Sequence, residues 1–333
     1  MKFYTVDAHC DTVHLFAQEH YNFWQENTCG QIDYPRLKQG GVNLQFFALF
    51  VEPEYKPFLA LSRALQLMEH FFCTLEKNKA NTIFIKTKKE LQEAVQNPHK
   101  LAVIMALEGG EPLESSKEIL HIFYRLGLRS VGLTWNQRNQ LADGVGVGKG
   151  ASGLTKMGKE IVKHLNRLGI VVDGAHLAKR GFYDLLETAT KPVLVSHANA
   201  AALCPHPRNL DKEQLLALKA HKGVVGLTFY PDFIAEKEAT LEKLLDHFCY
   251  IADLAGVEIL GLGSDFDGIE KVLPELSNVS HLPALTAGLR RRGFSEKEIA
   301  AIMGENMLKL LSSNLLEEEE NDSCRFTSSY TSK

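Results

Sequence analysis

The sequence predicts an α/β fold, and within that class a (β/α)8 barrel of the TIM type. The chain has 333 residues, which lies within the usual length of such barrels. Short apolar runs alternate with amphipathic segments along most of the chain, as expected of repeated strand–helix units. Eight such runs are present. A doubly wound open sheet shows the same alternation and is the competing architecture.

The apolar runs have the length and composition of strands in a buried parallel sheet. Runs such as LAVIMAL and IVVD are almost continuously apolar, as expected where helices cover both faces of the sheet. The predicted strands cover residues 3–9, 42–50, 101–107, 130–134, 170–173, 193–196, 224–228 and 258–263.

Amphipathic segments between these runs predict the helices. They cover residues 58–78, 114–126, 156–168, 178–189, 211–221 and 240–255. Asp211 can cap the helix that begins at Lys212, and Ser295 with Glu298 has the spacing of a capping box. We expect one barrel domain over residues 1–312 and a polar, disordered tail over 313–333, where EEEE and a Ser/Thr-rich end leave few apolar residues.

Charge and composition narrow the class of protein. Lys and Arg total 37 against 41 Asp and Glu, so no basic surplus suggests nucleic acid or an anionic membrane as a partner. The N-terminus lacks the apolar core of a signal peptide, and no later stretch is long and apolar enough to span a membrane. The six cysteines form no C-x-x-C pair and are expected to be free thiols. These features predict a cytoplasmic protein.

Side chains that bind metals follow five of the eight predicted strands. In a barrel the carboxyl ends of all strands meet on one face, where function collects. The stretch VDAHCDT contributes two of these side chains, and alternation along a strand would place them on one side and Cys10 on the other. The full set comprises His9, Asp11, Glu108, His176, His197 and Asp265.

The ligand types indicate which metal fits this set. Imidazoles and carboxylates without cysteine suit Zn²⁺ or a similar first-row ion. Five or six ligands exceed the three that a catalytic zinc usually takes from a protein. Two ions that share one carboxylate would use the set better.

Several of these motifs together resemble the membrane dipeptidase (renal dipeptidase) family of zinc peptidases, which are metal-dependent hydrolases. The motifs are DAHCDT, ALEGG, VVDGAH, LVSHANAAALCPHPRN and GSDFDG, in this order. The resemblance implies a barrel that binds two Zn²⁺ per chain. It implies that His9 and Asp11 hold one ion, that His176 and His197 hold the other, and that Glu108 bridges them.

The same resemblance implies roles in substrate turnover. Asp265 matches the acid/base beside the metals, and Arg208 matches the arginine that contacts the substrate. Animal members have a histidine where this chain has Trp135, so one substrate contact is unassigned. Asn136 and Asn139 are candidates to replace it, although both could serve only to shape their loop. The chain looks like a soluble, bacterial-type relative, because no signal peptide or apolar tail is recognisable.

The preferred interpretation is a metallodipeptidase that cleaves dipeptides with a free C-terminal carboxylate. The resemblance extends this to substrates with a D-residue at the C-terminal position. One alternative is another amidohydrolase-like barrel that acts on cyclic amides or lactones. Such enzymes often bridge their metals with a modified lysine, and no lysine follows a predicted strand here. A second alternative is a catalytically decayed binding protein. The sequence leaves open whether the chain forms a homodimer.

Overall fold

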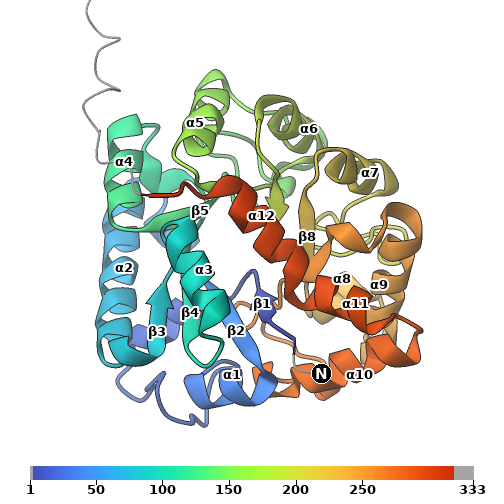
Figure 1. Cartoon of the computed structure of the whole chain (residues 1–333). Coiled ribbons are helices and arrows are strands. Elements are labelled where there is room, and N and C mark those ends of the chain that lie inside the picture. Colours follow the sequence, from blue (N-terminus) through green and yellow to red (C-terminus); the bar gives the residue numbers. More distant parts are fainter. Residues whose placement is uncertain (1–2, 319–333) are drawn as a thin grey trace, which may run out of the picture.

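A computed structural model describes residues 3–318, and the predicted barrel is confirmed (Figure 1). Eight parallel strands form the closed sheet, and each of the eight predicted strands is present with shifts of a few residues at its ends. A ninth, short strand was not predicted. The strands are β1 (Thr5–Asp7), β2 (Val42–Phe50), β3 (Thr82–Phe84), β4 (Leu101–Glu108), β5 (Leu128–Gly132), β6 (Val171–Asp173), β7 (Leu194–Val195), β8 (Val224–Leu227) and β9 (Leu260–Leu262).

The pairing of β2 with β4 closes the barrel. Along the sheet the order is β2-β1-β9-β8-β7-β6-β5-β4, and β4 then pairs in parallel with β2 from Leu44–Ala102 to Phe50–Glu108. A doubly wound open sheet would have two free edges, so this pairing excludes it. The extra strand β3 pairs only with the first three residues of β4, while β5 pairs with its last four.

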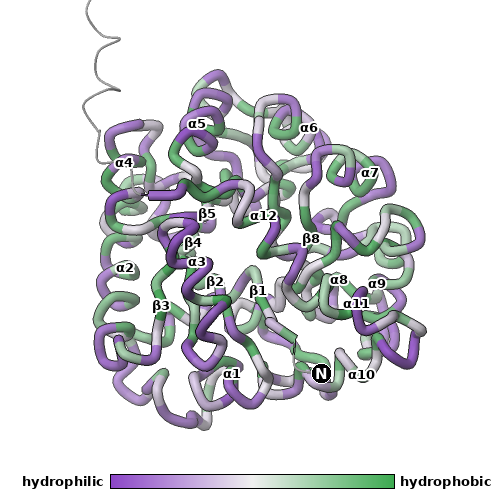
Figure 2. Tube along the Cα trace, viewed as in Figure 1, coloured by the Kyte–Doolittle hydropathy of each residue, from purple (hydrophilic) through white to green (hydrophobic). Residues whose placement is uncertain are grey.

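Helices surround the barrel, and all six predicted helices are present as α2, α4, α5, α6, α7 and α9 (Figure 1). Figure 2 shows hydrophobic colours along the strands and mixed colours along the surrounding helices. The helices are α1 (Tyr34–Gly40), α2 (Ala60–Glu76), α3 (Lys88–Gln96), α4 (Lys117–Arg125), α5 (Lys156–Arg167), α6 (Lys179–Thr188), α7 (Lys212–Ala220), α8 (Pro231–Ile234), α9 (Leu241–Ala255), α10 (Leu282–Arg291), α11 (Glu296–Ala300) and α12 (Asn306–Asn314).

Both predicted helix caps are confirmed. The Asp211 side chain accepts a hydrogen bond from the backbone of Gln214, and Ser295 and Glu298 form a capping box. The last helix continues to Asn314, two residues past the expected boundary at 312. Most of the tail expected over 313–333 lies outside the described residues.

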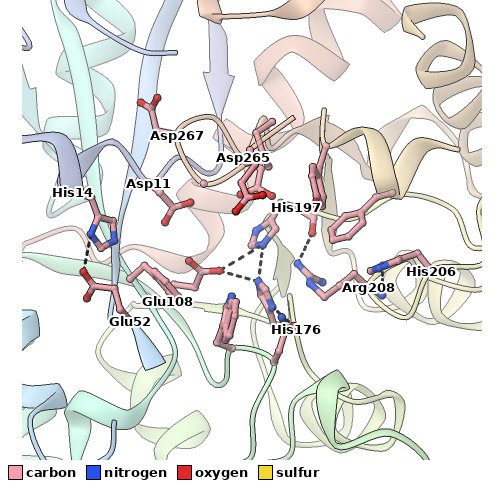
Figure 3. Close-up of a pocket in the computed structure, with 18 residues that line it drawn as sticks. Asp11, His14, Glu52, Glu108, His176, His197, His206, Arg208, Asp265 and Asp267 are labelled. Carbon is pink, nitrogen blue, oxygen red and sulfur yellow. Dashed lines mark hydrogen bonds and ion pairs between the residues drawn. The ribbon is translucent and has the colours of Figure 1, made fainter. Parts of the chain in front are cut away.

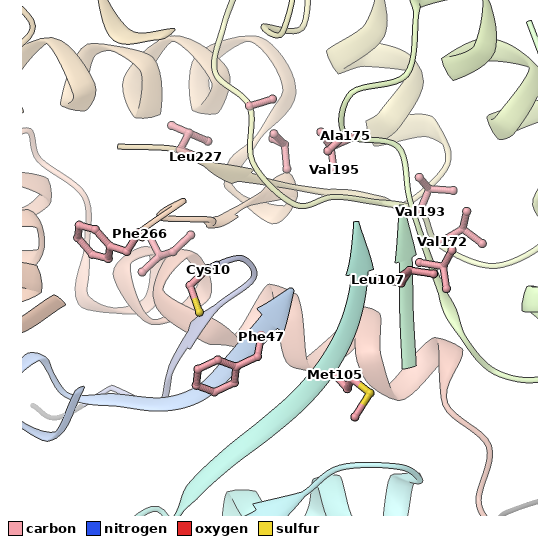
Figure 4. Packing of buried hydrophobic residues seen from close by; sticks show 14 of the residues in the cluster. Cys10, Phe47, Met105, Leu107, Val172, Ala175, Val193, Val195, Leu227 and Phe266 are labelled. Atoms are coloured by element: carbon pink, nitrogen blue, oxygen red, sulfur yellow. The ribbon is translucent and has the colours of Figure 1, made fainter. Parts of the chain in front are cut away.

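Side chains along β4 alternate between two apolar layers. Ala102 and Ile104 lie in the barrel interior, whereas Met105 and Leu107 pack between the strands and the outer helices (Figure 4). Because this alternation continues to the end of the strand, Glu108 is directed toward the interior at the carboxyl end. A strand that is buried along its whole length therefore also delivers a carboxylate to the open end of the barrel.

Helix α12 covers the opposite end of the barrel. Met307, Leu310 and Leu311 pack into the interior cluster together with residues of β1 and β2. The side-chain amide of Asn306 donates a hydrogen bond to the carbonyl of Leu260, at the start of β9 (2.9 Å). With the amino ends of the strands sealed in this way, the carboxyl ends remain accessible.

The apolar contact of α12 with the barrel interior yields a stability prediction. Leu311 is fully buried, so Leu311→Ala should lower the free energy of unfolding by about 2–5 kcal/mol through lost burial and a residual cavity. Urea denaturation of wild type and variant measures this difference. The exposed neighbour Lys309 supplies the control, because Lys309→Ala should change the free energy by less than about 0.5 kcal/mol. Equal effects of the two substitutions would contradict the packing role of α12.

Candidate metal centre

The six predicted metal-binding side chains converge at the open end of the barrel (Figure 3). They follow or end five different strands, namely β1, β4, β6, β7 and β9. All six are buried or nearly so. Each predicted residue is therefore brought into one cluster, although the strands that carry them are spread over more than 250 residues of sequence.

Within this cluster, Glu108 is shared between two groups of ligand atoms. Its Oε1 lies 2.8 Å from His176 Nε2 and 3.7 Å from His197 Nε2. Its Oε2 lies 3.5 Å from His9 Nε2, which in turn is 3.3 Å from Asp11 Oδ2. The ligand atoms of each group lie within 4.8 Å of one another, the spacing needed to surround one ion. One carboxylate thus faces two potential metal positions, one through each oxygen.

Asp265 belongs to a third overlapping group. Its Oδ1 lies 3.7 Å from His9 Nε2, and the two residues form a potential ligand set with His197. Asp265 therefore lies beside both groups that share Glu108 and lines the same pocket.

The first motif keeps the predicted strand alternation, although β1 itself ends at Asp7 and Asp11 directly precedes a 3-10 helix, η1 (Thr12–Ala17). Cys10 forms a parallel β-bridge with Phe266, in the loop after β9. Two backbone hydrogen bonds hold the segment there: Asp265 N donates to the His9 carbonyl (3.2 Å), and Asp11 N donates to the Phe266 carbonyl (2.9 Å). Cys10 points away into the apolar layer, as predicted (Figure 4).

Two residues of the centre adopt a backbone conformation that is uncommon for residues with a side chain. His176 and Asp265 have φ values of 65° and 66°. Left-handed conformations cost free energy and occur where the surrounding structure enforces them, often at functional sites. Gly268, which the sequence interpretation missed, permits the close approach of this last loop: a Cβ there would lie 2.1 Å from Asp11 Oδ2.

Neighbouring side chains orient the two histidines of one group. Asn136 Oδ1 lies 2.9 Å from His176 Nδ1, and Ser196 Oγ lies 2.8 Å from His197 Nδ1. Each ring therefore presents Nε2 to the centre of the cluster. Hydrogen bonds of this kind fix ring orientation and tautomer in metal sites. Asn136 thus lies where it can orient His176, and it also lines the pocket, so the predicted contact with substrate stays a prediction.

Burial and neighbouring carboxylates give the three histidines of the cluster different charge states. It lowers the pKa values of His176 and His197 well below the ordinary range, so both rings are neutral and able to bind a metal. Burial alone would also lower the pKa of His9, but the carboxylates of Glu108 and Asp11, with a smaller contribution from Asp265, raise it to about 10.

The carboxylates of the cluster carry an electrostatic cost that a cation would offset. Burial raises the pKa of Glu108 well above its ordinary value and that of Asp265 to about 7. His9 Nε2 and Asp11 Oδ1 are buried without a hydrogen-bond partner among the described residues. Buried polar atoms without partners are costly, and these belong to side chains that divalent ions bind. The cluster therefore fits a metal centre.

Arg208 is more buried than expected of a loop arginine. Only 5% of it is exposed, and its Nη2 donates a hydrogen bond to the His197 carbonyl (3.0 Å). Its guanidinium lies 5.5 Å from the ring centre of Phe233, and Nε has no hydrogen-bond partner among the described residues. Burial lowers its pKa to about 10, with opposing contributions from Asp265 and Glu108, so the group remains charged at neutral pH.

Of the other two predicted substrate contacts, Trp135 lines the pocket and Asn139 does not. Trp135 lines the pocket, with its ring centre 6.0 Å from that of His176. Asn139 does not line the pocket, because its side chain is used within its own loop. It donates to the Leu133 carbonyl (2.8 Å) and accepts from the backbone of Leu141 (2.8 Å). The prediction that Asn139 contacts substrate is therefore not supported.

The cluster forms the floor of a pocket of about 580 Å³. This volume suits a small molecule such as a dipeptide. Arg208 and Phe233 line one part of the wall, and Phe50 and Trp135 line another. Among residues 3–318, no helix has the length and apolar character needed to cross a membrane.

A barrel whose open end gathers histidines and carboxylates around a small pocket defines a metal-dependent hydrolase. The family model of membrane dipeptidases (peptidase family M19) matches residues 1–323. The chain therefore belongs to the membrane dipeptidase family, and it is a metal-dependent dipeptidase in class.

Individual relatives agree with this assignment. An uncharacterized dipeptidase of Schizosaccharomyces pombe is 32% identical over 329 residues, which cover 92% of this chain and 79% of the relative. Dipeptidase tcpJ of Claviceps purpurea is 30% identical over 332 residues, covering 92% and 76%. The crystal structure of a Rhodobacter sphaeroides metallopeptidase, liganded with a phosphinate mimic of L-Ala-D-Ala, superposes with a TM-score of 0.87 and 29% identity. The match covers 94% of this chain and 100% of that structure.

Proposed function

We propose that the protein is a binuclear zinc dipeptidase, and the shared position of Glu108 carries the proposal. His9 and Asp11 would hold one ion and His176 and His197 the other, with one Glu108 oxygen directed to each group. Bound zinc ions supply Lewis-acid activation of the substrate carbonyl and of the attacking water. Orientation of the substrate and transfer of protons remain the work of the protein side chains.

Asp265 is the proposed general acid and base. Its carboxylate lies beside both ligand groups and lines the pocket, where it can reach the attacking water and the leaving nitrogen. Burial raises the pKa of its carboxyl group to about 7, so the group can both accept and donate a proton near neutral pH. It would accept the proton from water as the carbonyl is attacked and donate it to the amine as the C–N bond breaks.

Arg208 is the proposed partner of the substrate's C-terminal carboxylate. It is charged, buried in the pocket wall, and retains an unpartnered Nε among the described residues. A guanidinium forms strong, directional pairs with carboxylates. A cation in the wall of the same pocket as the metal ligands would favour substrates whose carboxylate lies one residue beyond the scissile bond.

The proposal extends to dipeptides with a D-residue at the C-terminal position. The structurally similar Rhodobacter sphaeroides enzyme was crystallised with a mimic of L-Ala-D-Ala, which supports this extension.

We also propose a cytoplasmic location. It is supported by the free state of the five cysteines in the described part of the chain, Cys10, Cys29, Cys73, Cys204 and Cys249.

The alternative of a hydrolase for cyclic amides or lactones has less support. Among the described residues no lysine belongs to the ligand groups, and the residue that the two groups share is Glu108. Lys56, the lysine whose charge acts on His176, is instead ion-paired with Glu111. A decayed binding protein would have little reason to retain a complete ligand set together with Asp265 and Arg208.

Metal content tests the shared carboxylate. We expect two zinc ions per chain at saturation, and loss of activity when a chelator removes them. Glu108→Gln should lower the bound zinc to one ion or fewer, because the neutral amide cannot bridge two cations. Elemental analysis after equilibrium dialysis measures the stoichiometry. Glu270→Gln, at an exposed carboxylate of the same pocket, should retain two ions. Full activity with a single ion would contradict the proposal.

Asp265→Asn tests the proton transfer. The substitution keeps the shape of the side chain but removes the base, so kcat should fall by about 10²–10⁴ while the fold is retained. Steady-state kinetics on a dipeptide, together with zinc analysis, distinguishes this from metal loss. The control is Asp232→Asn, at a carboxylate outside the ligand groups that pairs with Lys271. A kcat within a few-fold of wild type would assign Asp265 another role.

Arg208→Met tests whether Arg208 selects dipeptides by binding their C-terminal carboxylate. Loss of a charge-assisted pair should reduce kcat/KM for a dipeptide roughly tenfold to a hundredfold. The corresponding dipeptide amide lacks the carboxylate, so its slower hydrolysis should change little. Kinetics of both enzymes with both substrates provides the comparison. An equal loss for acid and amide would mean that Arg208 supports the fold or the metal ligands.

A further inference from the structure

A buried ion pair lies behind one wall of the pocket and takes no part in the reaction described above. Lys56, whose side chain is 8% exposed, places Nζ 3.2 Å from Oε1 of Glu111. Oε2 of Glu111 is buried with no hydrogen-bond partner among the described residues. Buried ion pairs seldom add net stability, because desolvation offsets their attraction. The position of this pair behind the pocket wall therefore points to a role in the pocket and not in stability.

The Lys56 ammonium group also faces two aromatic rings that line the pocket. It lies 5.4 Å from the ring centre of Phe50 and 5.5 Å from that of Trp135. The two rings are 5.2 Å apart and tilted by 54°. We call Phe50 and Trp135 the aromatic wall. A cation within about 6 Å of a ring centre is attracted to the ring, so Lys56 holds both rings from behind.

The ion pair joins three loops that are distant in sequence. Phe50 ends β2, Glu111 follows β4, and Trp135 follows β5, so Lys56 connects all three. Gly109 allows Glu111 to reach this position: its φ is 94°, and a Cβ there would lie 2.5 Å from Oε2 of Glu111. The sequence ALEGG thus contains both the Glu108 carboxylate and Gly109, the glycine that leaves room for the side chain of Glu111.

The aromatic wall and Arg208 lie at different ends of the pocket. His14 contacts Phe50, with ring centres 5.9 Å apart, and so marks the end that carries the wall. His206 accepts a hydrogen bond from the backbone of Arg208 and marks the other end. Figure 3 shows His14 on one side and His206 and Arg208 on the other, with Glu108 between them.

We propose that the aromatic wall, held by Lys56 and Glu111, binds the side chain of the substrate's N-terminal residue and selects aromatic or large aliphatic side chains there. This inference rests on the proposed function. In a dipeptide, the leaving nitrogen and the C-terminal carboxylate lie on one side of the scissile carbonyl, and the N-terminal residue lies on the other. With the carboxylate at Arg208 and the carbonyl at the ligand cluster, the N-terminal side chain extends toward the wall.

Lys56 acts as a positioning residue in this arrangement, because the pocket is lined by the rings and not by the ammonium group. Two rings fixed at a constant tilt present a preformed apolar surface to the substrate. Such a surface loses little conformational entropy when a side chain binds. Removal of the cation should therefore weaken binding of large side chains in particular.

Dipeptide pairs that differ only at the N-terminal residue test the proposal. For the zinc-loaded wild type, kcat/KM should be at least about tenfold higher for Phe-Ala than for Ala-Ala. Lys56→Met keeps the length of the side chain and removes its charge, so it should reduce this ratio at least threefold, mainly through a higher KM for Phe-Ala. Glu111→Gln should act in the same direction. The control Lys219→Met, at an exposed lysine paired with Glu258, should leave the ratio unchanged.

The outcomes separate this inference from the proposed function. If the wild type cleaves Phe-Ala and Ala-Ala equally well, the selective wall is wrong although the dipeptidase stands. If it cleaves neither, nor any other dipeptide, the proposed function fails and the inference fails with it. If Lys56→Met and Glu111→Gln both reduce activity on the two substrates by the same factor, the ion pair supports the fold and the positioning role is contradicted. If Lys56→Met does not fold, Glu111→Gln alone decides between these outcomes.

Discussion

The burial of one carboxylate, that of Glu108, is the constraint on which the rest of the site depends. A carboxylate removed from water is costly unless positive charge compensates it. Here the two oxygens face separate groups, with His176 on one side and His9 and Asp11 on the other. Crowding of further carboxylates around Glu108 increases the cost. Two divalent cations held between these side chains would balance the charge, which is why we regard the cluster as a binuclear centre.

The barrel explains how such distant residues meet. Alternation along β4 directs Glu108 inward directly after an apolar strand, and the parallel arrangement brings the other ligands to the same end. Helix α12 seals the opposite end, so substrate reaches only the side that carries the ligands. A dipeptide would then lie across the centre, with its carboxylate at Arg208 and its N-terminal side chain against Phe50 and Trp135. Length selection and side-chain selection would thus be separate properties of the two ends.

Much of this could be predicted from the sequence, because continuous apolar runs mark buried strands and the ligands follow them directly. Strand β3 was not predicted: its short run lies between the polar stretches KNKAN and KTKK, and it pairs only with β4, outside the closed barrel. The convergence of His9 and Asp11 followed from strand alternation, as predicted, but the pairing of this segment with the loop after β9, which extends the alternation beyond the end of β1, could not be predicted. Asn139 could not be distinguished from Asn136 by sequence, because only the loop conformation decides which amide faces the pocket. The pairing of Lys56 with Glu111 depends on closure of the barrel, which brings together loops without any local sequence signal.

The central claim is that Glu108 lies between two metal ions. Anomalous diffraction from crystals of the zinc-loaded protein, recorded on both sides of the zinc absorption edge, tests it most directly. The account predicts two zinc peaks about 3.5–4 Å apart, with one Glu108 oxygen bound to each ion. One peak should also contact His9 and Asp11, and the other His176 and His197. A single peak, or a second ion that does not contact Glu108, would contradict the account.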